Sequence, residues 1–318
     1  MLVRKAFASL LCGAVTLGLV SASSAGSLQF EHVMNIGTAG AGPGQFKYVE
    51  DFAFDKHGHL LATDAANSNI QVFDKTTGKY LSQFGGKGDE DHNFEKPEGI
   101  AVAPDGHIFV ADYATGYVKK FDANYKWVKT FSGWGEKPGE NMKSEFMSVY
   151  NGLLYMAEAG NHRVNVFDME GNFKFLFGGS GAEPGKMNNP EASKVNGEGH
   201  VYVADLKNDR VQVFTHDGKL LKHWGKTGAE AGEFKTPAGV GLDKDGNVYI
   251  TEIGNDRVQV FDKDGNFLTM WGKKGAGNGE FGNLHGMIVD QETGWVYVAD
   301  TANNRIQVFK PVHAKSVN

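Results

Sequence analysis

Six short apolar segments of the sequence begin in the same way, and the clearest copies begin with Pro-x-Gly. In most of the six, the residue at the x position has an ionisable side chain. The residues at the x position are Glu50, Glu98, Glu145, Glu191, Ala238 and His285. Carboxylates held close together raise each other's pKa, so four ionised glutamates need a metal ion, a cationic ligand or shared protons. Carboxylates with a single imidazole suit Ca²⁺, Mn²⁺ or Fe²⁺ better than a zinc site dominated by histidine. The sequence therefore predicts a divalent metal bound by Glu50, Glu98, Glu145, Glu191 and His285.

The same positions have a second interpretation that needs no metal. The ring of side chains is then wide and hydrated, and its glutamates bond to strand-end amides or to lysines such as Lys96. If a metal is bound, it polarises a substrate or a bound water. A ring glutamate that the metal leaves free, Glu98 or Glu191, or His285 itself, would then transfer the proton. These three residues are the catalytic candidates.

A second set of acidic residues recurs 46 to 48 residues apart. Its members are Asp64, Asp112, Glu158, Asp205, Glu252 and Asp300. An acid in every copy is typical of a structural position, and in the last four copies an arginine five residues later, such as Arg305 after Asp300, is expected to pair with it. The first two copies lack that arginine. We therefore predict that Asp64 and Asp112 face a ligand, with Tyr113 and Phe146 as neighbouring walls.

Each acidic residue ends a copy of one phrase, as in residues 296–300, Val-Tyr-Val-Ala-Asp. A polar loop, a second apolar strand, a glycine turn, a third strand and a glycine-rich loop follow. Four strands of about five residues in a period of roughly 45 residues are the dimensions of a propeller blade. One such sheet buries both faces only if neighbours pack against it. The sequence thus predicts an all-β, six-bladed β-propeller over residues 28–310.

The chain ends indicate how the propeller closes. Residues 28–37 resemble the outermost strand of a blade, such as residues 266–272, whereas the last copy stops at Phe309 without that strand. We expect the N-terminal strand to complete the sixth blade and remove an exposed edge. Residues 311–318 are expected to form a C-terminal tail.

The repeated phrases resemble NHL repeats, and the resemblance covers residues 28–310. The motifs that carry it are Val-Tyr-Val-Ala-Asp, Asn-x-Arg-Ile/Val-Gln-Val-Phe, Asp-Gly-Asn-Phe and Phe/Trp-Gly-x-x-Gly. The resemblance implies a six-bladed propeller, in a family that includes peptidyl-hydroxyglycine amidating lyases, protein- or RNA-binding domains and secreted bacterial proteins. The zinc-binding histidines of the amidating lyases are expected near the starts of inner strands. Only His285 stands at such a position here, so the resemblance implies a different metal at the same place.

The first residues predict a secreted or periplasmic protein. Arg4 and Lys5 precede an apolar run over residues 6–20 and then a series of small residues, which is the pattern of a secretory signal peptide over residues 1–25. No later apolar run is long enough to span a bilayer. The only cysteine, Cys12, lies in this segment. The mature chain is therefore expected to contain neither a disulfide nor a thiolate site.

Charge narrows the expected partners. The formal net charge is −6, and the loss of Arg4 and Lys5 makes it −8. Such a chain is a poor match for nucleic acid and favours cationic ligands or metals. Two functions remain open: a metal-dependent lyase or hydrolase acting on a small molecule, and a non-catalytic scaffold whose acidic face receives a peptide, a cationic metabolite or a partner protein.

Overall fold

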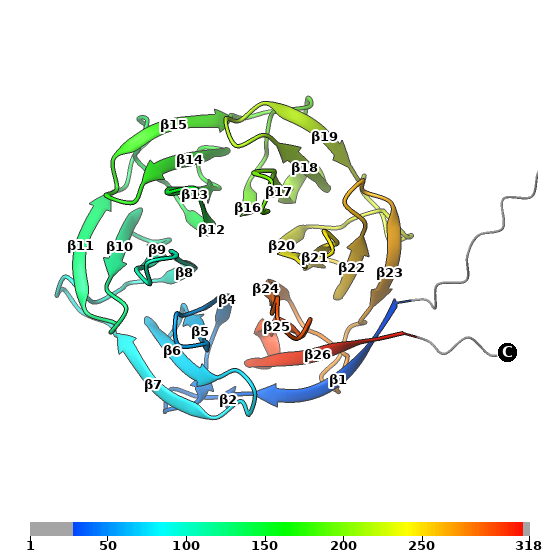
Figure 1. Cartoon of the computed structure of the whole chain (residues 1–318), viewed down its shortest axis with the longest axis horizontal. Coiled ribbons are helices and arrows are strands. Elements are labelled where there is room, and N and C mark those ends of the chain that lie inside the picture. The colour runs from blue at the N-terminus through cyan, green and yellow to red at the C-terminus, as the bar shows by residue number, and fades with distance from the viewer. Residues whose placement is uncertain (1–27, 314–318) are drawn as a thin grey trace, which may run out of the picture.

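Six four-stranded antiparallel sheets surround a central axis in the computed structural model, which describes residues 28–313 (Figure 1). The expected signal peptide lies outside the described residues. Apart from two 3₁₀ turns, Leu206–Asn208 and Thr301–Asn303, the described chain is strand, turn and loop. The predicted all-β, six-bladed propeller is confirmed. Within residues 28–313 no helix is long and apolar enough to cross a membrane.

The strands run outwards from the axis in the order of the sequence in the first five blades. The first two blades contain β4 (Val49–Phe54), β5 (His59–Asp64), β6 (Asn69–Asp74) and β7 (Tyr80–Gly85), then β8 (Pro97–Val102), β9 (Ile108–Asp112), β10 (Tyr117–Phe121) and β11 (Trp127–Ser132). The third and fourth contain β12 (Ser144–Tyr150), β13 (Leu153–Glu158), β14 (Arg163–Asp168) and β15 (Phe173–Gly178), then β16 (Pro190–Val195), β17 (Val201–Asp205), β18 (Arg210–Phe214) and β19 (Leu220–Trp224). The fifth contains β20 (Pro237–Leu242), β21 (Val248–Glu252), β22 (Arg257–Phe261) and β23 (Phe267–Trp271).

The sixth blade joins the two ends of the chain. It contains β24 (Leu284–Val289), β25 (Val296–Asp300), β26 (Arg305–His313) and, as its outer strand, β1 (Leu28–Ile36). Strand β1 pairs antiparallel with β26, from Leu28 opposite His313 to Ile36 opposite Ile306, so the predicted closure is confirmed. Leu28, the first residue of β1, lies opposite His313, so β26 extends to His313. Residues 311–313 therefore belong to the sheet and not to the expected C-terminal tail. The short parallel pair β2 (Thr38–Ala39) and β3 (Gln45–Phe46) leads into the first blade.

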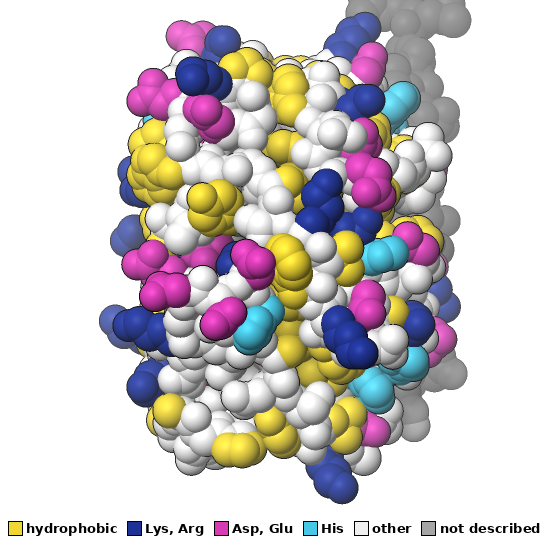
Figure 2. Space-filling model, turned by 90° about the vertical axis from the view of Figure 1, so that its left-hand side faces the viewer, with side chains coloured by type: hydrophobic (Ala, Val, Ile, Leu, Met, Phe, Trp, Pro, Cys, Tyr) yellow, Lys and Arg dark blue, Asp and Glu magenta, His cyan; other side chains and the backbone are white. Residues whose placement is uncertain are grey.

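The hydrophobic core lies between neighbouring blades. All residues of the second strands β9, β17 and β25 are buried, because the adjacent blades cover both faces of each sheet. Outer strands alternate between exposed and half-buried side chains, as in β19. Figure 2 shows the resulting outer wall, on which hydrophobic side chains are interspersed with charged ones. Trp127 and Val128 on β11 are among the exposed hydrophobic residues.

Glycines near the starts of inner strands let neighbouring blades approach closely. A Cβ at Gly99 would overlap the carbonyl oxygen of Glu145 in the next blade, and a Cβ at Gly286 would overlap that of Glu50. The absence of a side chain therefore allows close backbone contact at this level of the axis. This approach brings the residues of the ring together.

Candidate functional site

The ring residues converge at one end of the axis. Each occupies the second position of an inner strand, so all six lie at the same level. Their side chains are buried; His285, the most accessible, is 9 % exposed. The ionisable members are Glu50, Glu98, Glu145, Glu191 and His285. The repeat thus gathers four carboxyl groups and one imidazole in a dry environment.

On one side of the ring, His285 lies between two carboxylates. Its Nδ1 is 2.8 Å from Glu50 Oε2 and 3.6 Å from Glu191 Oε1. The shorter contact is not aligned as a hydrogen bond, and neither Nδ1 nor Glu50 Oε2 has another hydrogen-bond partner in the protein. Burial lowers the pKa of His285, but the two carboxylates outweigh it and raise the pKa to about 10. Burial raises the pKa of Glu50, and His285 opposes that rise.

The other nitrogen of His285 faces the mouth of the ring. Nε2 lies 3.0 Å from Asn283 Nδ2 and 3.5 Å from the hydroxyl of Tyr48. The Tyr48 ring also packs edge-on against the imidazole, with centroids 5.6 Å apart. A neutral imidazole accepts a hydrogen bond from the Asn283 amide, whereas an imidazolium needs the amide oxygen turned towards it. Tyr48 and Asn283 therefore orient the ring of His285.

On the opposite side, Glu98 contacts Lys96 and Glu145. The ammonium of Lys96 forms an ion pair with Glu98 Oε1, and the carboxyl groups of Glu98 and Glu145 hydrogen bond to each other. Burial, followed by the charge of Glu50, raises the pKa of Glu98 to about 8. Burial and the charges of Glu191 and Glu98 raise the pKa of Glu145 well above its usual value. The raised pKa values favour the protonated form of both glutamates.

The ring carries an excess of negative charge. When its four carboxyl groups are ionised, they face one imidazolium and one ammonium, which leaves two negative charges unbalanced. Two unbalanced charges in a buried site require protons or a cation. Among residues 28–313, no three His, Cys, Asp or Glu side chains are already gathered as a metal-ligand group. Metal binding by the five ring residues stays a prediction.

Lys96 and two tyrosines form the mouth of the ring. Lys96 Nζ lies 4.1 Å from the centroid of the Tyr113 ring and 5.7 Å from that of Tyr48, within range of cation–π attraction. The Lys96 side chain is 39 % exposed, which leaves part of it open to solvent. Tyr113 therefore lies at the predicted wall of the mouth. Its contact with a ligand stays a prediction.

Phe146 has a different environment from the one expected. It follows Glu145 by one residue on β12, within the β-bulge between Ser144 and Met147. Its ring is fully buried in the core between the third and fourth blades, against Ala192 and Tyr202. The structure therefore places Phe146 in the core and not at the mouth.

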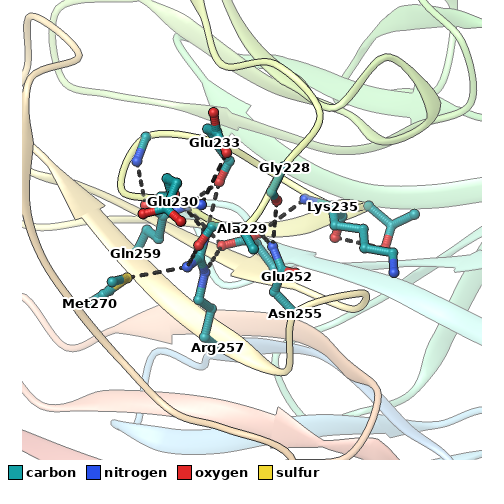
Figure 3. Close-up of polar contacts among 12 residues, drawn as sticks. Gly228, Ala229, Glu230, Glu233, Lys235, Glu252, Asn255, Arg257, Gln259 and Met270 are labelled. Atoms are coloured by element: carbon teal, nitrogen blue, oxygen red, sulfur yellow. Dashed lines mark hydrogen bonds and ion pairs between the residues drawn. The ribbon is translucent and has the colours of Figure 1, made fainter.

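The predicted acid–arginine pairs form in all four expected blades. Figure 3 shows the pair of the fifth blade, in which Arg257 Nε lies 2.6 Å from Glu252 Oε1. The same guanidinium donates to the carbonyl oxygens of Ala229, Glu230 and Glu233 in the preceding glycine-rich loop. Equivalent ion pairs join Glu158 to Arg163, Asp205 to Arg210 and Asp300 to Arg305. These acids hold loops in place, as a structural position requires.

Asp64 and Asp112 lack such an arginine, yet their carboxylates are engaged by the protein. Asp64 accepts hydrogen bonds from the backbone N–H of Tyr48 at 3.0 Å and from the side chain of Asn67. Asp112 accepts from the backbone N–H of Glu95 and of Lys96. Both are at most 1 % exposed. The acids of the other four blades accept equivalent backbone bonds in addition to their arginines. The carboxylates of Asp64 and Asp112 thus fix the segments that carry Tyr48 and Lys96, and direct contact with a ligand stays a prediction.

Two threonines that the sequence interpretation missed position ring residues. Thr63 Oγ1 donates to the carbonyl oxygen of Glu98 at 2.7 Å, and Thr251 Oγ1 donates to that of His285 at 2.5 Å. Each hydroxyl thus joins the second strand of one blade to the inner strand of the next. The other four repeats have alanine at this position. The sequence signal for these two residues was a threonine directly before the acidic residue that ends the repeated phrase, where the other repeats have alanine.

The mouth residues also had a sequence signal. Tyr48, Lys96 and Asn283 each precede a ring residue by two positions. The offset places them in the loop directly before the inner strand. Aligning the repeats two residues ahead of the ring would have identified them together.

Comparison with known proteins agrees with this architecture. Residues 94–121 match the NHL repeat family, and residues 242–310 match a family described as a 6-bladed beta-propeller. The described chain is therefore a six-bladed β-propeller in which residues 94–121 match the NHL repeat. A probable peptidyl-alpha-hydroxyglycine alpha-amidating lyase of Caenorhabditis elegans is 31 % identical over 137 residues, which are 40 % of this chain and 38 % of that relative. The match thus spans well under half the length of either protein.

Solved structures share the fold at low sequence identity. A Bacteroides thetaiotaomicron protein of unknown function superposes with a TM-score of 0.69 and 17 % identity, over 90 % of this chain and 76 % of that one. Virginiamycin B lyase from Staphylococcus aureus has a TM-score of 0.62 and 13 % identity, over 90 % and 99 %. A gluconolactonase from Xanthomonas campestris has the same TM-score and identity, over 85 % and 88 %. At these identities the likeness concerns the fold alone.

Proposed function

We propose that this NHL propeller is a lyase or hydrolase that acts on a small molecule or peptide at the mouth of the ring, and that the ring binds a divalent cation in exchange for protons. One observation carries the proposal: four buried carboxyl groups share one imidazole and one ammonium. A cation of charge two balances the ring when Lys96 is charged, His285 is neutral and one glutamate keeps its proton. Without the cation, His285 is charged, and protons on Glu98 and Glu145 balance the remaining carboxylates.

The donor atoms of the ring fit such a cation. Glu50 Oε2 and His285 Nδ1 face each other without a hydrogen bond, as two ligands of one ion would once His285 has lost its Nδ1 proton. Glu191 lies beside them, and Glu145 completes the set from the other side, which leaves Glu98 free to keep its proton. The set is rich in oxygen, which suits Ca²⁺, Mn²⁺ or Fe²⁺ better than Zn²⁺. A cation bound there supplies Lewis-acid polarisation of a carbonyl or of a water.

The chain's own residues would manage the proton and the substrate. Glu98 has a pKa of about 8, so it retains a proton at neutral pH and can donate it to a leaving group. Lys96 holds Glu98 in place and offers its exposed ammonium to an oxygen of the substrate. His285 Nε2, oriented by Tyr48 and Asn283, is the second group able to take or give a proton at the mouth.

The named relatives support an enzyme on this scaffold. The C. elegans relative is described as a probable lyase, and the structural neighbours include virginiamycin B lyase and a gluconolactonase. A catalytically inactive histidine-to-alanine variant of the virginiamycin B lyase was solved with quinupristin. That protein therefore depends on a histidine, which is compatible with a role for His285 here. We also propose, from residues 1–25, that the protein is secreted or periplasmic.

The metal content of untagged protein tests this proposal. The protein is treated with a chelator, incubated with Mn²⁺, Ca²⁺ or Zn²⁺, desalted and analysed by mass spectrometry of the elements. One equivalent of Mn²⁺ or Ca²⁺ is expected, with its loss in the Glu98→Gln, Glu191→Gln double variant. Glu198→Gln, whose side chain is 74 % exposed, is the matched control and should retain the metal. Metal-free wild-type protein would contradict the proposal.

A scaffold without catalysis is the second candidate, and one observation favours it. With His285 and Lys96 charged and two protons retained, the ring is electrically balanced without any ion. The mouth would then receive a peptide, a cationic metabolite or a partner protein. Metal-free protein whose unfolding midpoint is unchanged by the double substitution supports this candidate.

A further inference from the structure

A second cavity lies at the other end of the axis. It has a volume of about 490 Å³ and is lined by the far ends of the inner strands of all six blades. The ring residues occupy the second position of these strands, whereas the cavity is lined from the fourth position onwards or just beyond. The cavity is therefore separate from the ring and its mouth. A volume of this size is within the range of small-molecule sites.

The walls of this cavity are mainly apolar. Each blade contributes a half-buried hydrophobic side chain: Phe54, Val102, Val149, Val195, Leu242 and Ile288. Half-buried apolar side chains around one space gain free energy when a ligand displaces the water there. The body of the ligand is therefore expected to be apolar.

One cationic side chain lines the cavity, and its hydrogen-bonding capacity is largely unused. Lys194 Nζ donates to the carbonyl oxygen of Met147 at 3.3 Å and lies 3.6 Å from Asp51 Oδ1. An ammonium has three donors, so two remain without an acceptor within hydrogen-bonding distance. Asp51 is fully buried, and its Oδ1 has no hydrogen-bond partner. The other charged residue of the lining, Asp243, accepts from Tyr249 and Asn247 and is already satisfied.

We propose that this cavity binds an apolar monocarboxylate, whose hydrocarbon body contacts the six hydrophobic side chains and whose carboxylate accepts hydrogen bonds from Lys194 Nζ. The Lys194 side chain is 16 % exposed, so its ammonium can be reached from the cavity. Charge-assisted hydrogen bonds from an ammonium to a carboxylate are the strongest of this type. The proposal does not depend on a metal in the ring.

Calorimetric titration with octanoate and with octanol tests the chemistry of the ligand. Octanoate is expected to bind one to one and more tightly than octanol. Lys194→Met should weaken octanoate at least about tenfold and leave octanol unchanged. Lys194→Arg keeps the cation and should retain octanoate binding even if Lys194→Met is poorly folded. Absence of octanoate binding at millimolar concentration, or octanol binding as tightly as octanoate, would overturn the proposal.

A substitution at the rim tests the location. Gly197 lines the cavity, and a Cβ there meets nothing within 4 Å, so Gly197→Trp adds a bulky side chain without backbone strain. Both probes should then bind at least about tenfold more weakly. Glu198→Trp, at an exposed neighbour outside the lining, is the control and should bind as the wild type does. If Gly197→Trp binds octanoate normally, or Glu98→Gln in the ring abolishes binding, the ligand does not occupy this cavity.

Discussion

His285 Nδ1 lies 2.8 Å from Glu50 Oε2, and this contact joins the sixth blade to the first. The ends of the described chain meet within the sixth blade, which β1 completes before the chain continues into the first. Each side chain is buried, and neither atom of the contact has a hydrogen-bond partner. The protonation states of His285 and Glu50 therefore depend on whether a proton or a cation lies between these two atoms.

Stability should fall as pH rises from 5 to 8 in the presence of a chelator. The pKa of Glu98 is about 8 in the fold against a usual value of 4.5, and that of His285 is about 10 against 6.5. A raised pKa contributes stability that is fully present below the usual value and is lost as pH rises through the folded value. Each proton that the folded state retains and the unfolded state loses changes the free energy of unfolding by about 1.4 kcal/mol per pH unit.

Urea unfolding at several pH values measures this slope. Glu98→Gln should flatten the decline between pH 5 and 8, because glutamine does not titrate. Glu198→Gln should leave it unchanged, since that side chain is exposed. A wild-type free energy of unfolding that rises over this range would show that the ring does not retain its protons.

The threonine hydroxyls are expected to position the ring. Thr251→Val removes the bond to the His285 carbonyl and the bond from the Gly239 N–H without changing side-chain size, and should cost about 2–3 kcal/mol of stability. The imidazole resonances of His285 in NMR titrations should shift as well, which a purely local packing change would not cause. Thr76→Val, in an exposed turn, is the control and should alter neither quantity. Unchanged His285 resonances in Thr251→Val would refute the positioning role.

The outer arginines should matter for folding and not for ligand binding. Arg257→Met leaves the fully buried Glu252 without its ion pair and should cost about 3–5 kcal/mol. Adding Glu252→Gln in the same chain should recover part of that loss, because no uncompensated charge remains buried. Urea unfolding of the single and double variants measures the difference. Equal stability of the two would mean that the charge of Glu252 carries no cost.

The strand β1 should be required for stability, because it completes the sixth blade. A chain that begins after Ile36 lacks the partner of β26 along its whole length. Its thermal unfolding midpoint is expected to fall by more than about 10 °C, if it folds at all. Supplying residues 28–36 as a peptide should restore part of the loss. A truncated protein with an unchanged midpoint would contradict the role of this closure.

The repeat explains why the fold and the ring could be predicted from sequence. Spacings of 46 to 48 residues fix the blade, and a repeat that starts its inner strand with Pro-x-Gly places every x residue at one level of the axis. The four acid–arginine pairs followed from a constant offset of five residues. The closure by β1 followed from a strand that was present at one end of the chain and absent from the other.

Side-chain details within the ring required the structure. The pairing of Glu98 with Lys96 and Glu145 depends on how turns direct neighbouring side chains, which residue spacing does not encode. Phe146 lies in the core and not at the ring, at a β-bulge of β12 that the sequence pattern does not indicate. The cavity beside Lys194 is a space left among six strands, and the sequence carries no signal for such a space.

Titration with Mn²⁺ by calorimetry at pH 7, in two buffers that differ in ionisation enthalpy, tests most directly whether the ring exchanges protons for a cation. One Mn²⁺ should bind per chain with release of at least about one proton, and both signals should vanish in the Glu98→Gln, Glu191→Gln double variant. Binding without proton release, or equal binding by the double variant, would show that the cation lies outside the ring.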